Sequence, residues 1–278
     1  KDPRPSLIAC RTHIGFGLPT RQDKSSAHGE PPGDEELAGA KQKLGWPVEP
    51  RFLVPDEVRE HLRPAGERGR KAHAEWTKLM QRYTKAQPER AAEFTRTQAG
   101  KLPYGLEKLL PVLPADPKGV ATRAAYGKAL NATAGALPEL IGGSADLTPS
   151  NQTSIKDGGD FTPEARASRY LRFGVREHAM GAILNGIALH GGLLPYGGTF
   201  MVFADYMRPQ VRLAAIMGNR VIFIYTHDSI GVGEDGPTHQ PIEHLASLRA
   251  IPNLVVLRPA DANETNLAWL AALERSTG

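Results

Sequence analysis

The chain has 278 residues, of which 40% are hydrophobic and 23% are charged, so it can bury one large core or two modest ones. The formal charge of +4 comes mostly from residues 51–101, where acidic side chains interleave with basic ones and aromatic residues are few. A nucleic-acid surface gathers basic side chains on one face, so this pattern favours a solvated helical face and no nucleic-acid partner.

Cysteine content and hydropathy exclude two further classes of protein. Cys10 is the single cysteine, which excludes an internal disulfide and CxxC-type zinc sites and indicates a reducing, cytoplasmic setting. Residues 179–204 lack Asp, Glu, Lys and Arg, but Pro195 and two pairs of glycines divide them into a helix, a short strand and a turn. A membrane span needs about 20 mostly apolar residues in one run, so we predict core here and no membrane contact.

The two ends of the chain resemble internal positions of a longer sequence. The first residues, KDPRPSLIAC, have no initiator Met and no signal-peptide pattern, and the last, LERSTG, come shortly after a predicted helix. We expect both ends to be cuts inside a larger protein.

The first 117 residues predict little sheet. Residues 5–10 have the pattern of a short buried strand, and a helix is predicted over 34–44. From 47 to 117 no strand pattern persists, and several prolines, Pro64 among them, divide the stretch. We predict a long helical linker there, whose apolar residues at helical spacing are Trp76, Leu79, Met80 and Tyr83.

From Val120 onward, predicted strands and helices alternate. This alternation is typical of an α/β fold in which a parallel sheet carries helices on both faces, and ligands then bind beyond the carboxyl ends of the strands. Pro209 is expected to kink or break its helix, and Asp261 with Glu264 forms a capping pattern for the last helix. The predicted strands are 139–146, 170–175, 193–200, 220–227 and 253–259. The predicted helices are 119–136, 176–190, 201–217, 241–249 and 262–275.

The loop after the strand 220–227 carries the strongest chemical signal. The sequence THDSIGVGEDGPTHQP places His227 at the strand end, with Asp235 and His239 four residues apart in a glycine-rich frame. Histidine titrates near neutral pH and can move protons or bind phosphate. Three such groups at the end of one strand favour a functional loop over a simple connection.

Glu177 is the second candidate. It lies at a predicted strand-to-helix junction, ahead of an apolar helix face. A first-turn acid that complements the helix dipole is the simplest interpretation, and the local sequence alone favours it. The functional alternative is a carboxyl group held in an apolar crevice and suited to sharing a proton.

Three further motifs admit a structural and a functional interpretation. GGSADLTPSN follows a buried strand, and its hydroxyls and backbone N–H groups, with Arg123 from the preceding helix, could hold an anion. GGTFMVFADY spaces Phe200, Phe203 and Tyr206 three apart, which suits core packing or an aromatic wall for a flat heterocycle. His28 in SAHGEPPGDEE is a lone histidine. No HExxH, EF-hand or CxxC pattern occurs, so we expect no metal held wholly by this chain.

Taken together, these segments resemble the transketolase family of thiamine diphosphate enzymes. The resemblance rests on GGSADLTPSN, RFGVREHAMGAILNGIALHGG, PYGGTF, THDSIGVGEDGPTHQPIEHLASLRAIPNL and RPADANE, which cover most of 119–265. IGFG, HGEPPGDEE and LGW are similar to the end of the family's diphosphate-binding domain. The resemblance implies that residues 1–46 are the C-terminal end of that domain, 47–117 a helical interdomain linker, and 118–278 a pyrimidine-binding domain truncated at its C-terminal end.

The resemblance also implies an activity and a site. A two-carbon ketol unit would move from a ketose phosphate to an aldose phosphate, with thiamine diphosphate and Mg²⁺ or Ca²⁺ as cofactors. Glu177 would bond the aminopyrimidine ring and promote its imino tautomer, which deprotonates the thiazolium carbon. The other implied roles are a pyrimidine pocket of Phe203, Phe200 and Tyr206; contacts of His28 with the diphosphate and the sugar hydroxyls; a bond from Asp235 to the donor's C2 hydroxyl; assistance by His239 at the reacting carbonyl; and sugar-phosphate binding by Arg123, Ser150 and His227.

One departure from the family concerns the metal. The family's GDG and later Asn, which hold the diphosphate and the metal, are absent, as are its earlier histidines, a later phosphate-binding arginine and a C-terminal domain. The metal ligands are therefore expected outside these residues. Because the family's cofactor lies between two subunits, a homodimer is implied, in which His28 and Glu177 of one chain serve different sites.

Other interpretations remain open. Dihydroxyacetone synthase shares most of these motifs, whereas deoxyxylulose-phosphate synthase fits the SADLTPSN loop less well. A non-catalytic subunit or paralogue is the alternative from another class, and the intact Glu177 and loop histidines argue against it. Asp228 and Glu234 receive no chemical role and are predicted to be structural.

Overall fold

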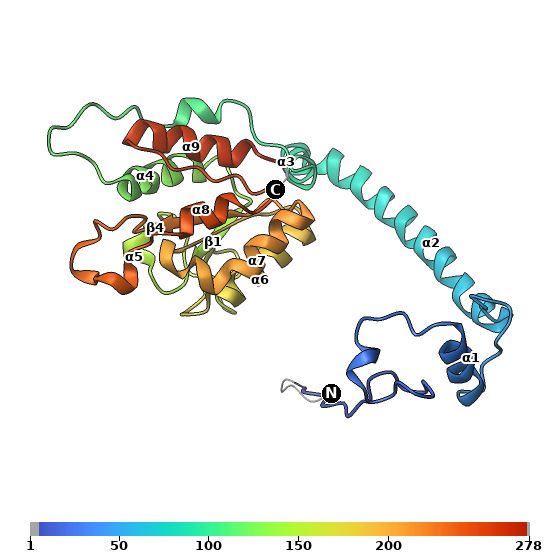
Figure 1. The fold of residues 1–278 in the computed structure, drawn as a ribbon. Coiled ribbons are helices and arrows are strands. Elements are labelled where there is room, and N and C mark those ends of the chain that lie inside the picture. The colour runs from blue at the N-terminus through green and yellow to red at the C-terminus, as the bar shows by residue number, and fades with distance from the viewer. Residues whose placement is uncertain (1–5, 277–278) are drawn as a thin grey trace. The chain divides into compact units, whose positions relative to one another are not determined.

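The computed structural model describes residues 6–276 and divides the chain into two compact units, residues 1–79 and 80–278 (Figure 1). The first unit contains the turn η1 (Ser25–Ala27), helix α1 (Asp34–Lys43) and most of α2 (Asp56–Ala86). The second contains the end of α2 and every strand that the structure describes.

The first unit confirms one predicted element and corrects another. Helix α1 confirms the helix expected over 34–44, whereas the strand expected over 5–10 is wrong for residues 6–10. Leu7 and Ile8 are 96% and 82% exposed. A strand needs a neighbour for its backbone donors and acceptors, and no described residue of the first unit forms one. Residue 5 lies outside the described residues.

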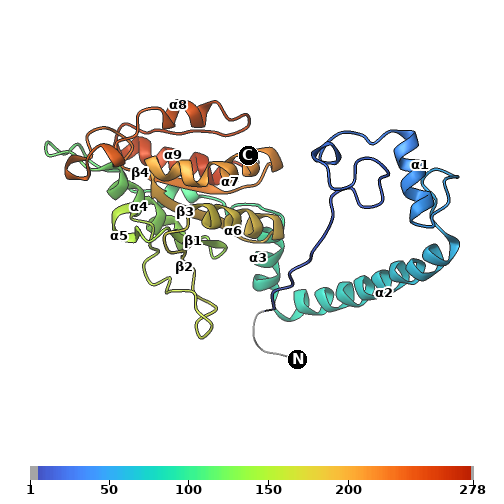
Figure 2. The same ribbon diagram turned by 60° about the horizontal axis from the view of Figure 1, so that its bottom comes forward.

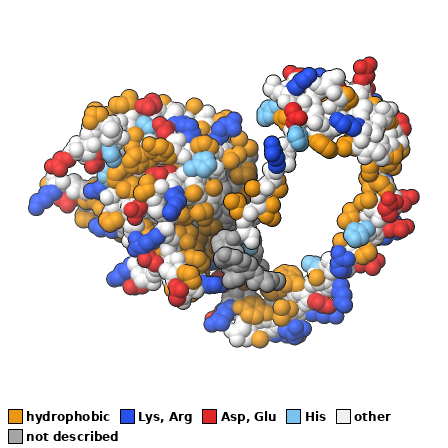
Figure 3. All heavy atoms as spheres, turned by 90° about the horizontal axis from the view of Figure 1, so that it is seen from below, with side chains coloured by type: hydrophobic (Ala, Val, Ile, Leu, Met, Phe, Trp, Pro, Cys, Tyr) orange, Lys and Arg blue, Asp and Glu red, His pale blue; other side chains and the backbone are white. Residues whose placement is uncertain are grey.

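The predicted linker consists of α2, α3 (Pro88–Gln98) and the turn η2 (Leu106–Leu109). Pro64 does not divide it, because α2 continues past this residue. None of the described residues of α2 is buried. Figure 3 shows acidic, basic and apolar side chains interspersed on the visible face, which fits the solvated helical face expected from the sequence. The domain boundaries at 46/47 and 117/118 stay predictions.

Four parallel strands form one sheet in the second unit. They are β1 (Leu140–Ser144), β2 (Tyr170–Arg172), β3 (Leu194–Phe200) and β4 (Ile222–Thr226). Their order is β2-β1-β3-β4, and all pairings are parallel. Every residue of the central strand β3 is buried, as a strand covered on both faces requires. The carboxyl ends of all four strands therefore meet at one edge.

Helices cover both faces of this sheet, as predicted (Figures 1 and 2). On one face lie α4 (Thr122–Ala134) and α9 (Ala262–Glu274), and on the other α6 (Glu177–His190) and α7 (Ala204–Met217). The first face buries a core that includes Leu130, Leu137, Tyr196, Trp269 and Leu273. The second buries Met180, Leu184, Met207, Val211 and Leu248. The α/β architecture with a parallel sheet is confirmed.

The remaining elements are short and flank the carboxyl edge of the sheet. They are α5 (Thr148–Asn151), η3 (Met201–Phe203), η4 (Gly233–Asp235), η5 (Pro237–His239) and α8 (His244–Arg249). The break considered at Pro209 is wrong, because α7 continues past it and loses only the one backbone donor that proline lacks. No described helix is long and apolar enough to cross a membrane.

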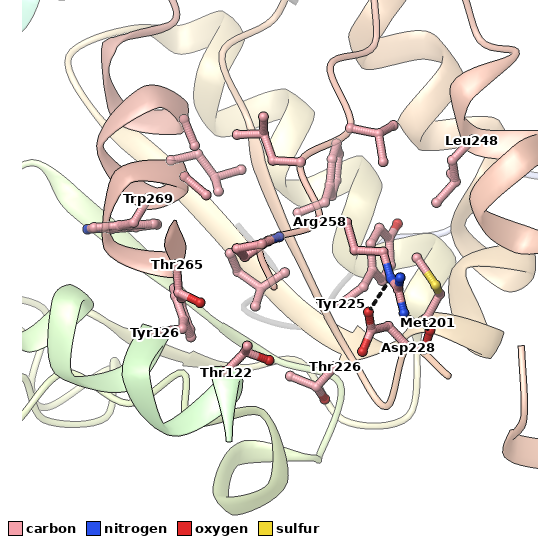
Figure 4. A pocket seen from close by; sticks show the side chains of 18 of the residues that line it. Thr122, Tyr126, Met201, Tyr225, Thr226, Asp228, Leu248, Arg258, Thr265 and Trp269 are labelled. Atoms are coloured by element: carbon pink, nitrogen blue, oxygen red, sulfur yellow. Dashed lines mark hydrogen bonds and ion pairs between the residues drawn. The ribbon is translucent and has the colours of Figure 1, made fainter. Parts of the chain in front are cut away.

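The fifth strand predicted over 253–259 does not form. Residues 253–259 have no strand pairing, and Val255 and Leu257 are each 46% exposed. Leu254 and Val256 pack their side chains against the apolar core instead, so the segment stays near the sheet while its backbone is unpaired. A cavity of about 880 Å³ is lined by this segment, β4, α4 and α9 (Figure 4).

The cap of α9 is confirmed and offers a test of local stability. Asp261 Oδ1 accepts hydrogen bonds from the N–H groups of Asn263 and Glu264, each at 2.8 Å, and Glu264 Oε2 accepts from the N–H of Ala260 at 2.7 Å. We expect Asp261→Ala to lower the free energy of unfolding by about 1 kcal/mol. Asp261→Asn keeps the acceptor and should cost much less. Equal losses in both variants, measured by urea unfolding, would show that the cap oxygen is not the stabilising group.

Candidate active site

Polar and aromatic side chains gather at the carboxyl edge of the sheet. Strand β1 ends at Ser144, β3 at Phe200 and β4 at Thr226, and His227 follows directly. The loop predicted to be functional continues from there through η4 and η5. Parallel sheets bind their ligands at this edge, so the loop lies where a binding site is expected.

His227 is held in an unusual turn against an aromatic ring. Its φ of +55° lies in the left-handed region that non-glycine residues rarely adopt. The imidazole stacks on Phe200 with ring centroids 3.7 Å apart. Its Nε2 lies 3.4 Å from Arg123 Nη1 and 4.0 Å from Asp235 Oδ2. Burial, and after it the positive charge of Arg123, lowers the pKa of His227, so the neutral ring is favoured beside the guanidinium.

An aromatic wall lies next to His227. The rings of Phe200 and Phe203 are nearly parallel, at 10°, with centroids 5.9 Å apart. His239 approaches them edge-on, 5.3 Å from Phe203 and 6.0 Å from Phe200. Tyr206 extends the wall at 6.0 Å from Phe203. Such a surface can hold a flat heterocycle by stacking or edge contacts, so the residues present fit the pyrimidine ring of thiamine diphosphate.

Glu177 is buried at the first turn of α6. It is 7% exposed, and its Oε1 accepts a hydrogen bond from Thr199 Oγ1 at 3.3 Å. Thr199 immediately precedes Phe200 on β3, so the carboxyl group lies beside the strand that carries the aromatic wall. Both interpretations of the sequence therefore apply: Glu177 is a first-turn acid, and its carboxyl group lies in a crevice with little access to water.

The other predicted residues differ in how the structure places them. Ser150 lies on α5, half-buried, next to Asn151, and Asp235 is exposed on η4. His28 is exposed in the first unit, directly after η1. The structure joins the following predicted residues through direct contacts: Phe200, Phe203, Tyr206, Arg123, His227, Asp235 and His239.

Several residues at this edge were missed by the sequence reasoning. Arg258 Nε donates to Asp228 Oδ2 at 2.8 Å, which fits the structural role expected for Asp228 (Figure 4). Asn151 and Thr226 form a buried hydrogen bond beneath His227. The sequence offered one signal, since both are neighbours of singled-out residues, but their side-chain partners are distant along the chain.

The large cavity beside β4 is distinct from the aromatic wall. Its lining includes Arg123 and His227, but neither Glu177 nor Phe203. Figure 4 shows Trp269, Thr265, Tyr126 and other mainly apolar side chains around it. The chemical groups converge elsewhere, so we locate the candidate active site by side-chain geometry rather than by cavity size.

One group of possible metal ligands, Asp205, Glu243 and His244, occurs among the described residues. Asp205 already pairs with Arg208 at 2.7 Å, which lowers the pKa of the carboxyl group, and lies 3.1 Å from His244 Nε2. The guanidinium balances the charge that a cation would need. This cluster is an ion-pair network beside α7.

Comparisons with known proteins agree with this arrangement. Residues 118–278 match the family described as "Transketolase, pyrimidine binding domain", and residues 1–103 match "Transketolase, thiamine diphosphate binding domain". The chain belongs to the transketolase family. It is 55% identical to the transketolase of Geobacillus stearothermophilus over 272 residues, which is 98% of this chain and 41% of that protein. The transketolase of a Nostoc species is 52% identical, again over 98% of this chain and 41% of the relative.

Solved transketolases have the same fold. The enzyme from Leishmania mexicana superimposes with a TM-score of 0.87 at 46% identity, over 95% of this chain and 39% of that one. A Pichia stipitis transketolase in complex with sedoheptulose 7-phosphate gives the same score and identity, over 95% and 40%. This transketolase family member thus spans about 41% of the length of the curated relatives it matches.

Proposed function

We propose that this protein is a transketolase, which uses thiamine diphosphate to transfer a two-carbon ketol unit from a ketose phosphate to an aldose phosphate. The observation that carries the proposal is the buried carboxyl group of Glu177 beside the strand that bears Phe200. The sequence identity of 55% to a known transketolase supports it. The relatives favour this activity over that of dihydroxyacetone synthase.

Glu177 is proposed to act on a proton. When bound, thiamine diphosphate supplies a carbon nucleophile that accepts and releases the ketol unit. The carboxyl group of Glu177, with Thr199 donating to Oε1, would hold a proton in place against the pyrimidine ring. Phe203, Phe200 and Tyr206 would keep that ring in place. The wall excludes water from one side, which strengthens the hydrogen bond.

The sugar phosphate would bind at the outer end of the same edge. Arg123 and the imidazole of His227 lie 3.4 Å apart at Nη1 and Nε2, and Ser150 lies on the neighbouring α5. Guanidinium and imidazolium donors together form charge-assisted hydrogen bonds with phosphate. This placement puts the phosphate at the exposed end and the reacting carbons toward the aromatic wall.

The remaining roles complete the proposed site. Asp235 would accept a hydrogen bond from the donor's C2 hydroxyl, and His239, edge-on to Phe203, would assist at the reacting carbonyl. His28 is proposed to contact the diphosphate and the sugar hydroxyls. A homodimer, a divalent Mg²⁺ or Ca²⁺ ion held by residues outside this chain, and a cytoplasmic location also stay predictions; one relative is named a chloroplastic transketolase.

Removing Arg123 tests the phosphate assignment. We expect Arg123→Ala to raise the KM for xylulose 5-phosphate about 10- to 100-fold with little change in kcat, because the lost contacts are the same in the ground and transition states. Lys128→Ala removes a positive charge from the same helix and serves as the control. A lower kcat at unchanged KM in Arg123→Ala would contradict phosphate binding.

A further inference from the structure

A line of buried polar side chains leads from β1 to His227. Ser144 Oγ donates to Asn151 Oδ1 at 2.7 Å, and Asn151 Nδ2 donates to Thr226 Oγ1 at 2.7 Å. Thr226 Oγ1 lies 3.0 Å from Nδ1 of His227. Ser144, Asn151 and Thr226 are 1%, 0% and 7% exposed. Buried polar groups with full hydrogen bonding fix the orientation of what they contact, so this line bears on the imidazole.

The contacts of His227 determine which nitrogen carries its proton. Arg123 has donors only, so the imidazole nitrogen beside it, Nε2, has to be the acceptor. In the neutral ring the proton is then on Nδ1, and Nδ1–H donates to Thr226 Oγ1. Either orientation of the Asn151 amide leaves this oxygen free to accept. The geometry thus selects the Nδ1–H tautomer.

The charged and titratable groups around His227 come from several elements. Arg123 on α4 and His239 on η5 disfavour a positive ring, whereas Asp235 on η4 and the adjacent Asp228 favour it. Burial disfavours it most, so the pKa of His227 is lowered in the site without substrate. A phosphate group would add two negative charges next to Nε2 and reverse this balance.

We propose that Thr226, supported by Asn151, is a positioning residue that fixes the Nδ1–H tautomer of His227, so that Nε2 is the nitrogen that meets a phosphate group and takes up a proton from solvent when it binds. This inference rests on the proposed function for its substrate. Nε2 without a proton repels a phosphate oxygen, because both carry lone pairs. With Nε2 protonated, the imidazolium donates at both ends, to Thr226 through Nδ1–H and to phosphate through Nε2–H.

Replacing Thr226 by valine keeps the shape of the side chain and removes the acceptor. The protonated ring would then bury an unsatisfied Nδ1–H, and the neutral ring would place its proton on Nε2. Thr226→Ser restores the hydroxyl and should restore the wild-type state. Thr133→Val is the matched control, because it removes a fully buried hydroxyl from α4.

The first measurement is the ¹⁵N spectrum of the full-length enzyme labelled with [¹⁵N]histidine, with His227 assigned by its loss in His227→Gln. We expect a protonated Nδ1 and an unprotonated Nε2 in wild type, Thr226→Ser and Thr133→Val, and the reverse in Thr226→Val. Added inorganic phosphate should protonate Nε2 in wild type. A wild-type ring with its proton on Nε2, or a tautomer unchanged in Thr226→Val, would overturn the proposal.

The second measurement separates positioning from general damage. In Thr226→Val the KM for xylulose 5-phosphate should rise about fivefold, the size of one lost hydrogen bond, while the KM for unphosphorylated xylulose stays the same. Equal changes for both sugars would contradict the inference. If the protein transfers no ketol unit at all, the proposed function fails, and the ¹⁵N spectra still decide the tautomer.

Discussion

Glu177→Gln is expected to lower kcat for ketol transfer by about 10³-fold, because a glutamine of the same shape cannot hold the proton that the carboxyl group shares. The side chain is 7% exposed and bonded to Thr199, so water cannot easily take its place. The amide keeps an oxygen for the Thr199 hydroxyl, and the fold should therefore be unchanged. The measurement is the steady-state rate at saturating xylulose 5-phosphate and ribose 5-phosphate.

The control for this variant is Glu164→Gln, which makes the same change at an exposed position. It should keep wild-type kcat and the same midpoint of thermal unfolding, Tm. A Glu177→Gln enzyme that retains more than about a tenth of wild-type kcat would remove this carboxyl group from proton transfer, since general acid–base catalysis contributes at least about 10²-fold.

Gly143→Ala should have the largest effect on stability. Gly143 lies in β1, paired with Leu171 of β2, and an added Cβ would overlap the Leu171 carbonyl oxygen. The neighbouring Gly142 is equally confined, by Tyr196 on β3. Because a side chain can turn aside but a strand backbone cannot, β1 would have to separate from β2. We expect a loss of at least about 3 kcal/mol and a Tm lower by roughly 6–12 °C.

Gly186→Ala is the matched substitution. Gly186 lies within α6, and nothing stands within 4 Å of the position of its added Cβ. Alanine is a better helix former by about 1 kcal/mol, so this variant should be as stable as wild type or slightly more so. A Gly143→Ala protein with the wild-type Tm would contradict the close approach of β1 and β2.

The sequence was informative wherever the pattern of one element decides its structure. The apolar run before His227 became β4, the helix from Glu177 ended at Gly191 with a φ of +80°, and Asp261 capped α9. The failures have a common cause. The strands expected at 5–10 and 253–259 have strand-like sequences, but a strand exists only where a neighbour accepts its backbone hydrogen bonds.

The site shows the same division. Glycine-rich and histidine-rich motifs at strand ends pointed to Glu177, His227 and His239 before any geometry was available. Their environment was not predictable, because it depends on side chains far apart in the sequence. Thr226 bonds Asn151 across 75 positions, and no local pattern marks either as part of one network.

The central claim is that the buried Glu177 and its aromatic neighbours belong to a ketol-transferring enzyme. The most direct test supplies the full-length protein with thiamine diphosphate, magnesium, xylulose 5-phosphate and ribose 5-phosphate, and measures the sugar products. Two-carbon transfer between these pentoses predicts a seven-carbon ketose phosphate and a three-carbon aldose phosphate in equal amounts, at a rate that Glu177→Gln nearly abolishes. No seven-carbon product, or the same yield from Glu177→Gln, would contradict the account.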